Sequence, residues 1–170
     1  MESFYESIVK HHKTPKERLL DVGLFAVGII GAVIAFSVFG TMMLHGIGAV
    51  AAATVFFFAM RAIALNRWEY EYIITAGVID IDKIIAQRKR KRMLSFDARD
   101  CEIIAPLKNG NYYAEYKSLP VLDYTAYEGH EDNYFAVFER AGARTCVFFQ
   151  PTEDMVQMCK SCNPRNVYIA

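Results

Sequence analysis

Four cysteines give this chain its most obvious capacity for chemistry, and two of them form a CxxC motif, Cys159-Lys160-Ser161-Cys162. A CxxC pair can act as a redox dithiol or as half of a zinc site. A zinc site needs two further ligands, and the sequence contains no second CxxC and no HxxxH motif. A redox CxxC normally opens a helix, whose dipole lowers the thiol pKa, whereas this one closes the helix expected after Pro151.

The spacing of the same cysteines favours a role in packing. Met155, Cys159 and Cys162 recur at i, i+4 and i+7, which is typical of a core-facing helical stripe. We therefore predict that this pair lies in the core, and we predict neither a metal nor a cofactor. Cys101 and Cys146 fall on expected strands, and all four thiols should stay reduced in a cytoplasmic domain.

A run of five basic residues, Arg88-Lys89-Arg90-Lys91-Arg92, is the candidate lipid- or partner-binding site. On a strand the three arginines point one way and the two lysines the other. Each cation near an anionic membrane contributes about 1 kcal/mol, so the arginine face alone supplies roughly 3 kcal/mol. The alternative is a solvated hairpin whose charges protect a sheet edge from pairing. Nucleic acid is not an expected partner, because residues 69–170 carry 15 acidic and 13 basic side chains.

The other polar residues form no known catalytic arrangement. The four histidines are scattered, and the chain has no phosphate-binding glycine loop, GxSxG or HExxH motif. Five tyrosines between Tyr112 and Tyr127 suit either an aromatic binding surface or the core of a small β domain, and core packing is favoured. We therefore predict that the protein is not an enzyme.

A long uncharged segment indicates where these residues are held. The 39 residues from Val22 to Met60 contain no Asp, Glu, Lys or Arg, although 22% of the 170 residues are charged. A membrane helix needs about 20 mostly apolar residues. Val22–Leu44 and Ile47–Leu65 each meet that length, with His45-Gly46-Ile47-Gly48 as the expected loop. Small residues at Gly31/Ala35 and Ala49/Ala53 have the spacing that lets helices approach closely.

Charges at the ends of the hairpin predict its orientation. Lys10, Lys13, Lys16 and Arg18 precede the first span and Arg61 and Arg67 end the second, while the loop has no Lys or Arg. By the positive-inside rule, both termini should be cytoplasmic in the cell membrane. Thr14-Pro15-Lys16-Glu17 reads as a capping box that starts the first helix. Before it, Phe4, Tyr5, Ile8 and Val9 suit one face of a short surface helix or a frayed terminus.

After the second span the apolar residues alternate with period two, which indicates half-buried strands. The expected strands are 69–75, 78–82, 91–96, 101–107, 111–116, 121–127, 134–139 and 144–150, with a hairpin turn at Asn109-Gly110. A final helix should run from Thr152 to about Cys162. The predicted organisation is a juxtamembrane segment (1–18), a transmembrane hairpin (19–68) and a mostly β cytoplasmic domain (69–170) built as an antiparallel barrel or sandwich with a C-terminal helix.

This arrangement resembles the pleckstrin-homology-like domain in its bacterial, membrane-attached form. The residues that carry the resemblance are Tyr70-Glu71-Tyr72-Ile73-Ile74-Thr75, Gly77-Val78-Ile79, Met93-Leu94-Ser95-Phe96 and Ile103-Ile104. The whole chain also looks like a family of small two-span membrane proteins from Gram-positive bacteria. The resemblance implies a fold and a location. Phosphoinositide-binding members of the wider fold carry basic residues in the first strand–strand loop, whereas that loop here is the uncharged Ala76-Gly77.

Together these features predict a non-enzymatic, membrane-tethered binding or scaffold protein at the cytoplasmic face. Its expected partners are the membrane itself, anionic lipid headgroups or a protein. Two alternatives remain open at this point: a thiol- or metal-dependent activity at Cys159 and Cys162, and a structural subunit of a larger membrane complex.

Overall fold

The computed structural model describes residues 4–41, 44–108, 113–126 and 132–169. The chain divides into two compact units. One, the hairpin unit, is His12–Trp68, and the other, the β unit, combines Met1–His11 with Glu69–Ala170. The first eleven residues therefore belong with the β unit, although 57 residues of sequence separate them from the rest of it.

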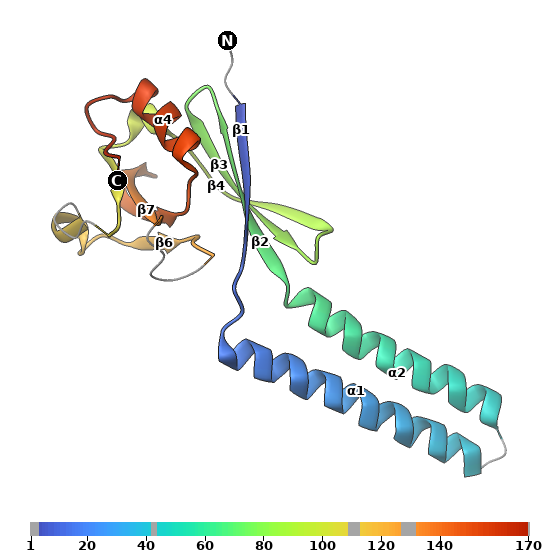
Figure 1. The fold of residues 1–170 in the computed structure, drawn as a ribbon. Coiled ribbons are helices and arrows are strands. Elements are labelled where there is room, and N and C mark those ends of the chain that lie inside the picture. The colour runs from blue at the N-terminus through green and yellow to red at the C-terminus, as the bar shows by residue number, and fades with distance from the viewer. Residues whose placement is uncertain (1–3, 42–43, 109–112, 127–131, 170) are drawn as a thin grey trace. The chain divides into compact units, whose positions relative to one another are not determined.

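The hairpin unit consists of helix α1 (Pro15–Thr41) and helix α2 (His45–Leu65), which run antiparallel (Figure 1). Both helices are long and apolar enough to cross a membrane. The expected capping box starts α1: the Thr14 backbone N–H donates to the Glu17 carboxylate at 2.7 Å, and the Glu17 N–H donates to Thr14 Oγ1 at 3.3 Å. The loop prediction was wrong, because His45 to Gly48 form the first turn of α2.

Glycines set the contact between the two helices. A Cβ atom at Gly28 would lie 2.6 Å from Ala59 Cβ, and one at Gly31 would lie 3.0 Å from Val55 Cγ1. A Cβ atom at Gly48 would lie 3.0 Å from Phe39 Cβ. Gly31 was expected at this contact, whereas Ala49 and Ala53 are exposed, so that part of the small-residue prediction was wrong. Sequence spacing alone does not tell which of several small-residue stripes faces the partner helix.

Four strands form the first sheet of the β unit, in the order β1 (Phe4–Lys10), β2 (Trp68–Thr75), β3 (Val78–Ile85) and β4 (Lys89–Asp97). Strand β1 pairs antiparallel with β2 from Phe4 opposite Thr75 to Lys10 opposite Glu69. Both interpretations of the N-terminal segment, a surface helix and a frayed terminus, were therefore wrong for Phe4–Lys10. A short isolated helix is marginal in water, whereas pairing with β2 gives this segment a full ladder of backbone hydrogen bonds.

Tight turns join β2 to β3 and β3 to β4. The first places Ala76 at φ 50° and Gly77 at φ 94°, and the second places Ala86 at φ 52° and Gln87 at φ 56°. Two consecutive residues with positive φ form the turn that matches the twist of a two-residue hairpin. Strands β3 and β4 are also longer than expected, because the basic residues Lys89 to Arg92 continue the ladder.

The second sheet has the order β5 (Ile103–Pro106), β7 (Tyr134–Arg140), β8 (Ala143–Phe149) and β6 (Val121–Asp123). Its β6–β8 pair is parallel, which departs from the expected antiparallel arrangement. Short 3₁₀ turns lie at Ala98–Asp100 and Ala114–Tyr116. The second takes the place of the later part of the strand expected at 111–116, whose first two residues lie outside the described ranges. The predicted turn at Asn109-Gly110 lies outside the described residues. Helix α4 (Glu153–Cys162) follows β8, as expected.

The core of the β unit lies between the two sheets, so its architecture is a sandwich. The rings of Phe96 on β4 and Phe138 on β7 stack with centroids 4.7 Å apart. Tyr72 is fully buried and donates its hydroxyl to the Tyr124 carbonyl at 2.7 Å. Tyr116 and Tyr124 are also buried, which confirms the core interpretation for these two tyrosines.

Candidate functional site

The five basic residues lie on the exposed hairpin formed by β3 and β4. Arg88 belongs to the turn, where its N–H donates to the Ile85 carbonyl at 3.1 Å, and the other four begin β4. The register pairs Lys89 with Ile85, Arg90 with Ile84, Lys91 with Lys83 and Arg92 with Asp82. All five side chains are exposed. The alternation expected from the sequence is therefore present from Lys89 to Arg92.

Two of the arginines are engaged by acidic side chains of neighbouring strands. Arg90 Nη2 lies 2.6 Å from Glu71 Oε1 on β2. Arg92 Nη1 lies 2.7 Å from Asp80 Oδ1 on β3, and Arg92 Nε contacts Asp82 Oδ1. Glu71 is fully buried and Asp82 is 3% exposed, so each of these carboxylates depends on an arginine at the sheet surface.

The carboxyl group of Glu71 is subject to opposing effects on its pKa. Burial raises the pKa of its carboxyl, a hydrogen bond with Glu6 on β1 raises the pKa further, and the Arg90 guanidinium opposes both. Arg90 therefore favours the ionised form of a buried acid whose surroundings favour the protonated form. The acids on β2 and β3 therefore give Arg90 and Arg92 partners within their own sheet. The alternation of Asp80 and Asp82 with apolar residues is a local feature of the sequence, whereas their pairing with Arg92 depends on the strand register.

The lysines of the hairpin occupy the opposite face. Lys89 and Lys91 form no ion pair with any acidic side chain of the described residues. Lys83, directly across from Lys91, lies 5.9 Å from the centre of the Tyr70 ring. Burial and then the neighbouring Lys91 charge lower the pKa of Lys83. This second face therefore concentrates positive charge, and the two outermost lysines project it into solvent.

The cysteines lie in a different part of the β unit. Cys101, Cys146 and Cys159 are at most 2% exposed, while Cys162 is half-buried. Burial raises the pKa of Cys146 and of Cys159 to about 12. Met155 is buried beside Cys159 on α4, so the expected packing stripe holds for these two residues. Within the described ranges, no three His, Cys, Asp or Glu side chains gather as a metal-ligand set.

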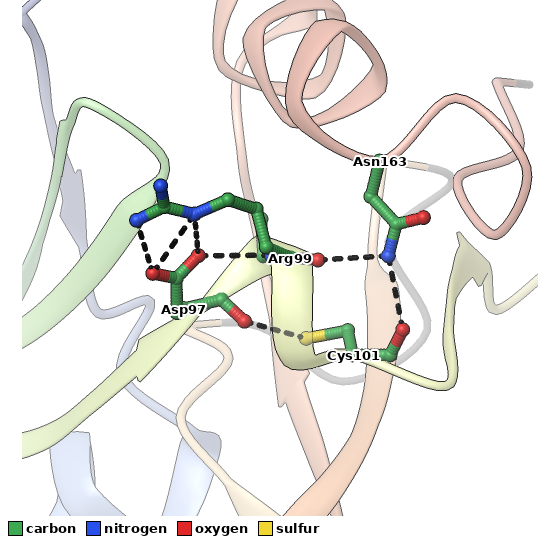
Figure 2. A network of polar contacts seen from close by, with 5 residues as sticks. Asp97, Arg99, Cys101 and Asn163 are labelled. Atoms are coloured by element: carbon green, nitrogen blue, oxygen red, sulfur yellow. Dashed lines mark hydrogen bonds and ion pairs between the residues drawn. The ribbon is translucent and has the colours of Figure 1, made fainter.

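A polar network near these thiols fastens α4 to the first 3₁₀ turn. Figure 2 shows the Asn163 amide donating to the carbonyls of Ala98 and Cys101, both at 3.0 Å. The Cys101 thiol donates to the Asp97 carbonyl at 3.4 Å, and the Asp97 carboxylate caps the turn while pairing with Arg99. Each group has a structural partner, so the network positions the C-terminal helix.

These environments predict slow thiol chemistry. In the folded chain at neutral pH, Cys101, Cys146 and Cys159 should react with iodoacetamide far more slowly than a free thiol, because only the thiolate is the nucleophile. Cys162 should be the first to react, because it alone is partly exposed. The measurement is alkylation followed by peptide mass spectrometry. Fast alkylation that persists in a Cys162→Ser chain would contradict the packing interpretation.

Comparison with known proteins identifies the relatives of this chain. The sequence profile of one family, described as "Bacterial PH-like domain (DUF6106)", matches residues 1–169. No curated protein and no solved structure matches the chain. The match extends over the N-terminal strand, both apolar helices and the two-sheet unit with its C-terminal helix. The chain therefore belongs to this family of bacterial PH-like domain proteins.

Proposed function

We propose that this protein is a non-enzymatic, membrane-tethered binding module at the cytoplasmic face, whose β3–β4 hairpin contacts anionic lipid headgroups. The observation that carries the proposal is the division of the basic run into two faces. Arg90 and Arg92 neutralise acids of their own sheet, which leaves Arg88, Lys89 and Lys91 as the cations available to an outside surface. We therefore expect Arg88, Lys89 and Lys91 to contact the lipid headgroups, in place of the three arginines expected from the sequence.

Chain connectivity supports a membrane as the contacted surface. Two residues, Asn66 and Arg67, separate the end of α2 from the start of β2, and four residues separate β1 from α1. Because β2 and β3 have eight residues each and are joined by a two-residue turn, the end of β3 lies beside the start of β2. The basic turn is therefore at the sheet end through which the chain continues into both apolar helices. By the positive-inside rule, the charge bias of the hairpin favours a cytoplasmic location for that side, where the leaflet is anionic.

The expected strength of this contact is modest. Three cations at about 1 kcal/mol each give roughly 3 kcal/mol, which is a little over a hundredfold in a contact equilibrium. The hairpin itself does not need to insert, because the two apolar helices already anchor the chain. Such a contact would orient the β unit rather than recruit it.

The test uses the full chain in nanodiscs, with a fluorophore on a Gln87→Cys variant at the exposed hairpin turn. Nitroxide-headgroup lipid should quench the fluorophore more strongly in discs rich in phosphatidylglycerol than in phosphatidylcholine discs, and added salt should reverse the difference. Replacing Lys89 and Lys91 by Gln should weaken the contact about 30-fold. The matched control replaces the exposed Lys117 and Arg140 by Gln and should leave quenching unchanged.

Two outcomes would overturn the lipid contact. One is equal quenching in neutral and anionic discs. The other is quenching that survives high salt. Either result would leave a protein partner as the occupant of the lysine face, and cross-linking from Lys89 in intact cells would then identify it.

A further inference from the structure

Two acidic side chains, Glu6 of the edge strand β1 and Glu71 of β2, form a carboxyl pair on the face of the first sheet opposite to Tyr72. The register places Ile8 opposite Glu71, and Glu6 lies two residues before Ile8 on β1. Glu6 is therefore a diagonal neighbour of Glu71, within reach of a long side chain. Glu71 is fully buried and Glu6 is exposed, so the carboxyl pair connects a buried acid to solvent.

The two oxygens of Glu71 differ in their partners. Oε1 accepts from Arg90 Nη2 at 2.6 Å. Oε2 is buried, and no donor of the described residues reaches it. Glu71 also shares a hydrogen bond with Glu6, and such a bond requires a proton on one of the two acids, because carboxylates only accept. A buried acceptor without a donor is costly, so this proton is the group that the carboxyl pair lacks.

The charges around the carboxyl pair favour a single proton on it. The charged groups of the neighbouring strands on this face are Glu6 and Lys10 of β1, Asp82 of β3, and Arg90 and Arg92 of β4. Arg92 contacts two aspartates of β3, and Lys10 lies opposite Glu69. Among the described residues, Arg90 is the cation that contacts Glu71. With one proton the pair keeps a single negative charge, which Arg90 balances, whereas without it two negative charges repel each other.

We propose that one proton shared between Glu6 and Glu71 Oε2 clasps the edge strand β1 onto β2, and that β1 loosens when the carboxyl pair loses this proton. Strand β1 depends on such a clasp because its neighbour in the described sheet is β2 alone. The same strand continues, after four residues, into α1. The device is independent of the lipid contact, because neither acid is among the residues expected to contact headgroups.

The direction of the pH effect follows from the surroundings of Glu71. Burial and then Glu6 raise the pKa of its carboxyl in the folded chain, against the opposing charge of Arg90. A detached, hydrated strand releases the proton at the ordinary glutamate pKa of about 4.3. The clasp is therefore complete below about pH 4.3, and it is lost as pH rises through the raised pKa of Glu71.

The experiment measures amide hydrogen exchange of the full chain in detergent micelles at about pH 4 and about pH 8, after correction for intrinsic exchange rates. Protection of the β1 amides that pair with β2 should fall about fivefold over this range, as expected when a cross-strand pair becomes a pair of like charges. Equal protection of β1 at both pH values would overturn the proposal.

A variant and a matched control separate the carboxyl pair from other titrating groups. Glu6→Gln supplies a permanent amide donor for Glu71 Oε2, so the fivefold fall should disappear. Glu69→Gln makes the same change on the same ladder, opposite Lys10, and should keep the fall. A fall that persists in Glu6→Gln, or that disappears equally in Glu69→Gln, would refute the clasp.

A direct titration detects the shared proton itself. The side-chain carboxyl carbons of Glu6 and Glu71, followed by carbon-13 NMR in the full chain, should shift in the same two steps, because two acids that share a proton titrate as a unit. In Glu6→Gln, Glu71 should titrate in one step. Independent single-step titrations of the two acids in the native chain would overturn the proposal.

Discussion

Replacing Arg90 by glutamine is expected to destabilise the β unit by about 2–3 kcal/mol at pH 8, a large effect for a residue with a half-exposed side chain. The substitution leaves Glu71 fully buried without its cation. A buried carboxylate without a partner is costly, and the cost falls on the folded state alone, because the unfolded chain hydrates both groups. The measurement is urea unfolding of the full chain in mild detergent, followed by near-ultraviolet circular dichroism.

The pH dependence of this variant gives the sharper test. Burial and Glu6 raise the pKa of Glu71 in the folded state, and removing Arg90 raises it further. The unfolded chain releases that proton at the ordinary glutamate pKa of about 4.3, while the folded variant holds it to higher pH. Stability should therefore fall as pH rises above about 4.3 and should match the native chain at lower pH.

Two further variants complete this prediction. Adding Glu71→Gln to Arg90→Gln removes the buried acid and should remove the pH slope. Lys91→Gln makes the same kind of change at the neighbouring residue, which has no acidic partner among the described residues, and should change stability by less than about 0.5 kcal/mol. An Arg90→Gln variant as stable as Lys91→Gln at pH 8 would show that Glu71 does not depend on Arg90.

Replacing Phe135 by alanine should destabilise the second sheet by about 3–5 kcal/mol, because it truncates one of the largest fully buried side chains. Phe135 on β7 is completely buried, and its ring centre lies 5.4 Å from that of Tyr113 and 5.9 Å from that of Tyr116. Truncation removes the side chain around which these two tyrosines pack, and a compact sandwich has little freedom to close the cavity. The same urea titration measures the loss.

The control for this prediction is Phe4→Ala on the edge strand β1. Phe4 is 58% exposed, so its removal should cost less than about 1 kcal/mol. The comparison also bears on the tyrosine-rich segment. If Tyr113 and Tyr116 are core residues, their ring resonances should shift in Phe135→Ala and not in Phe4→Ala. Similar losses in both variants would instead indicate that this part of the sandwich is loosely packed.

Local patterns in the sequence were sufficient for most of the elements. The apolar stretches, the capping box at Thr14 and the alternation around Tyr72 each depend on residues close together in the chain, so they predict helices and strands without knowledge of the fold. The stripe of Met155 and Cys159 also placed α4 correctly against the core. The expected strand began only at Lys91, but the two-face alternation expected of the basic run on a strand agrees with the observed register from Lys89 to Arg92.

Tertiary structure decided what each face contacts. Glu71 and Arg90 are 19 residues apart and meet only because β2, β3 and β4 are neighbours in one sheet. Strand β1 could not be recognised from its own pattern, because Phe4, Tyr5, Ile8 and Val9 also suit a helix until β2 offers an edge with which to pair. Residues of β1 and of the start of α4, more than 140 residues apart in the chain, line one cavity. Periodicity reports which side chains share a face, but the partners of a face depend on strand order, which the folded chain alone establishes.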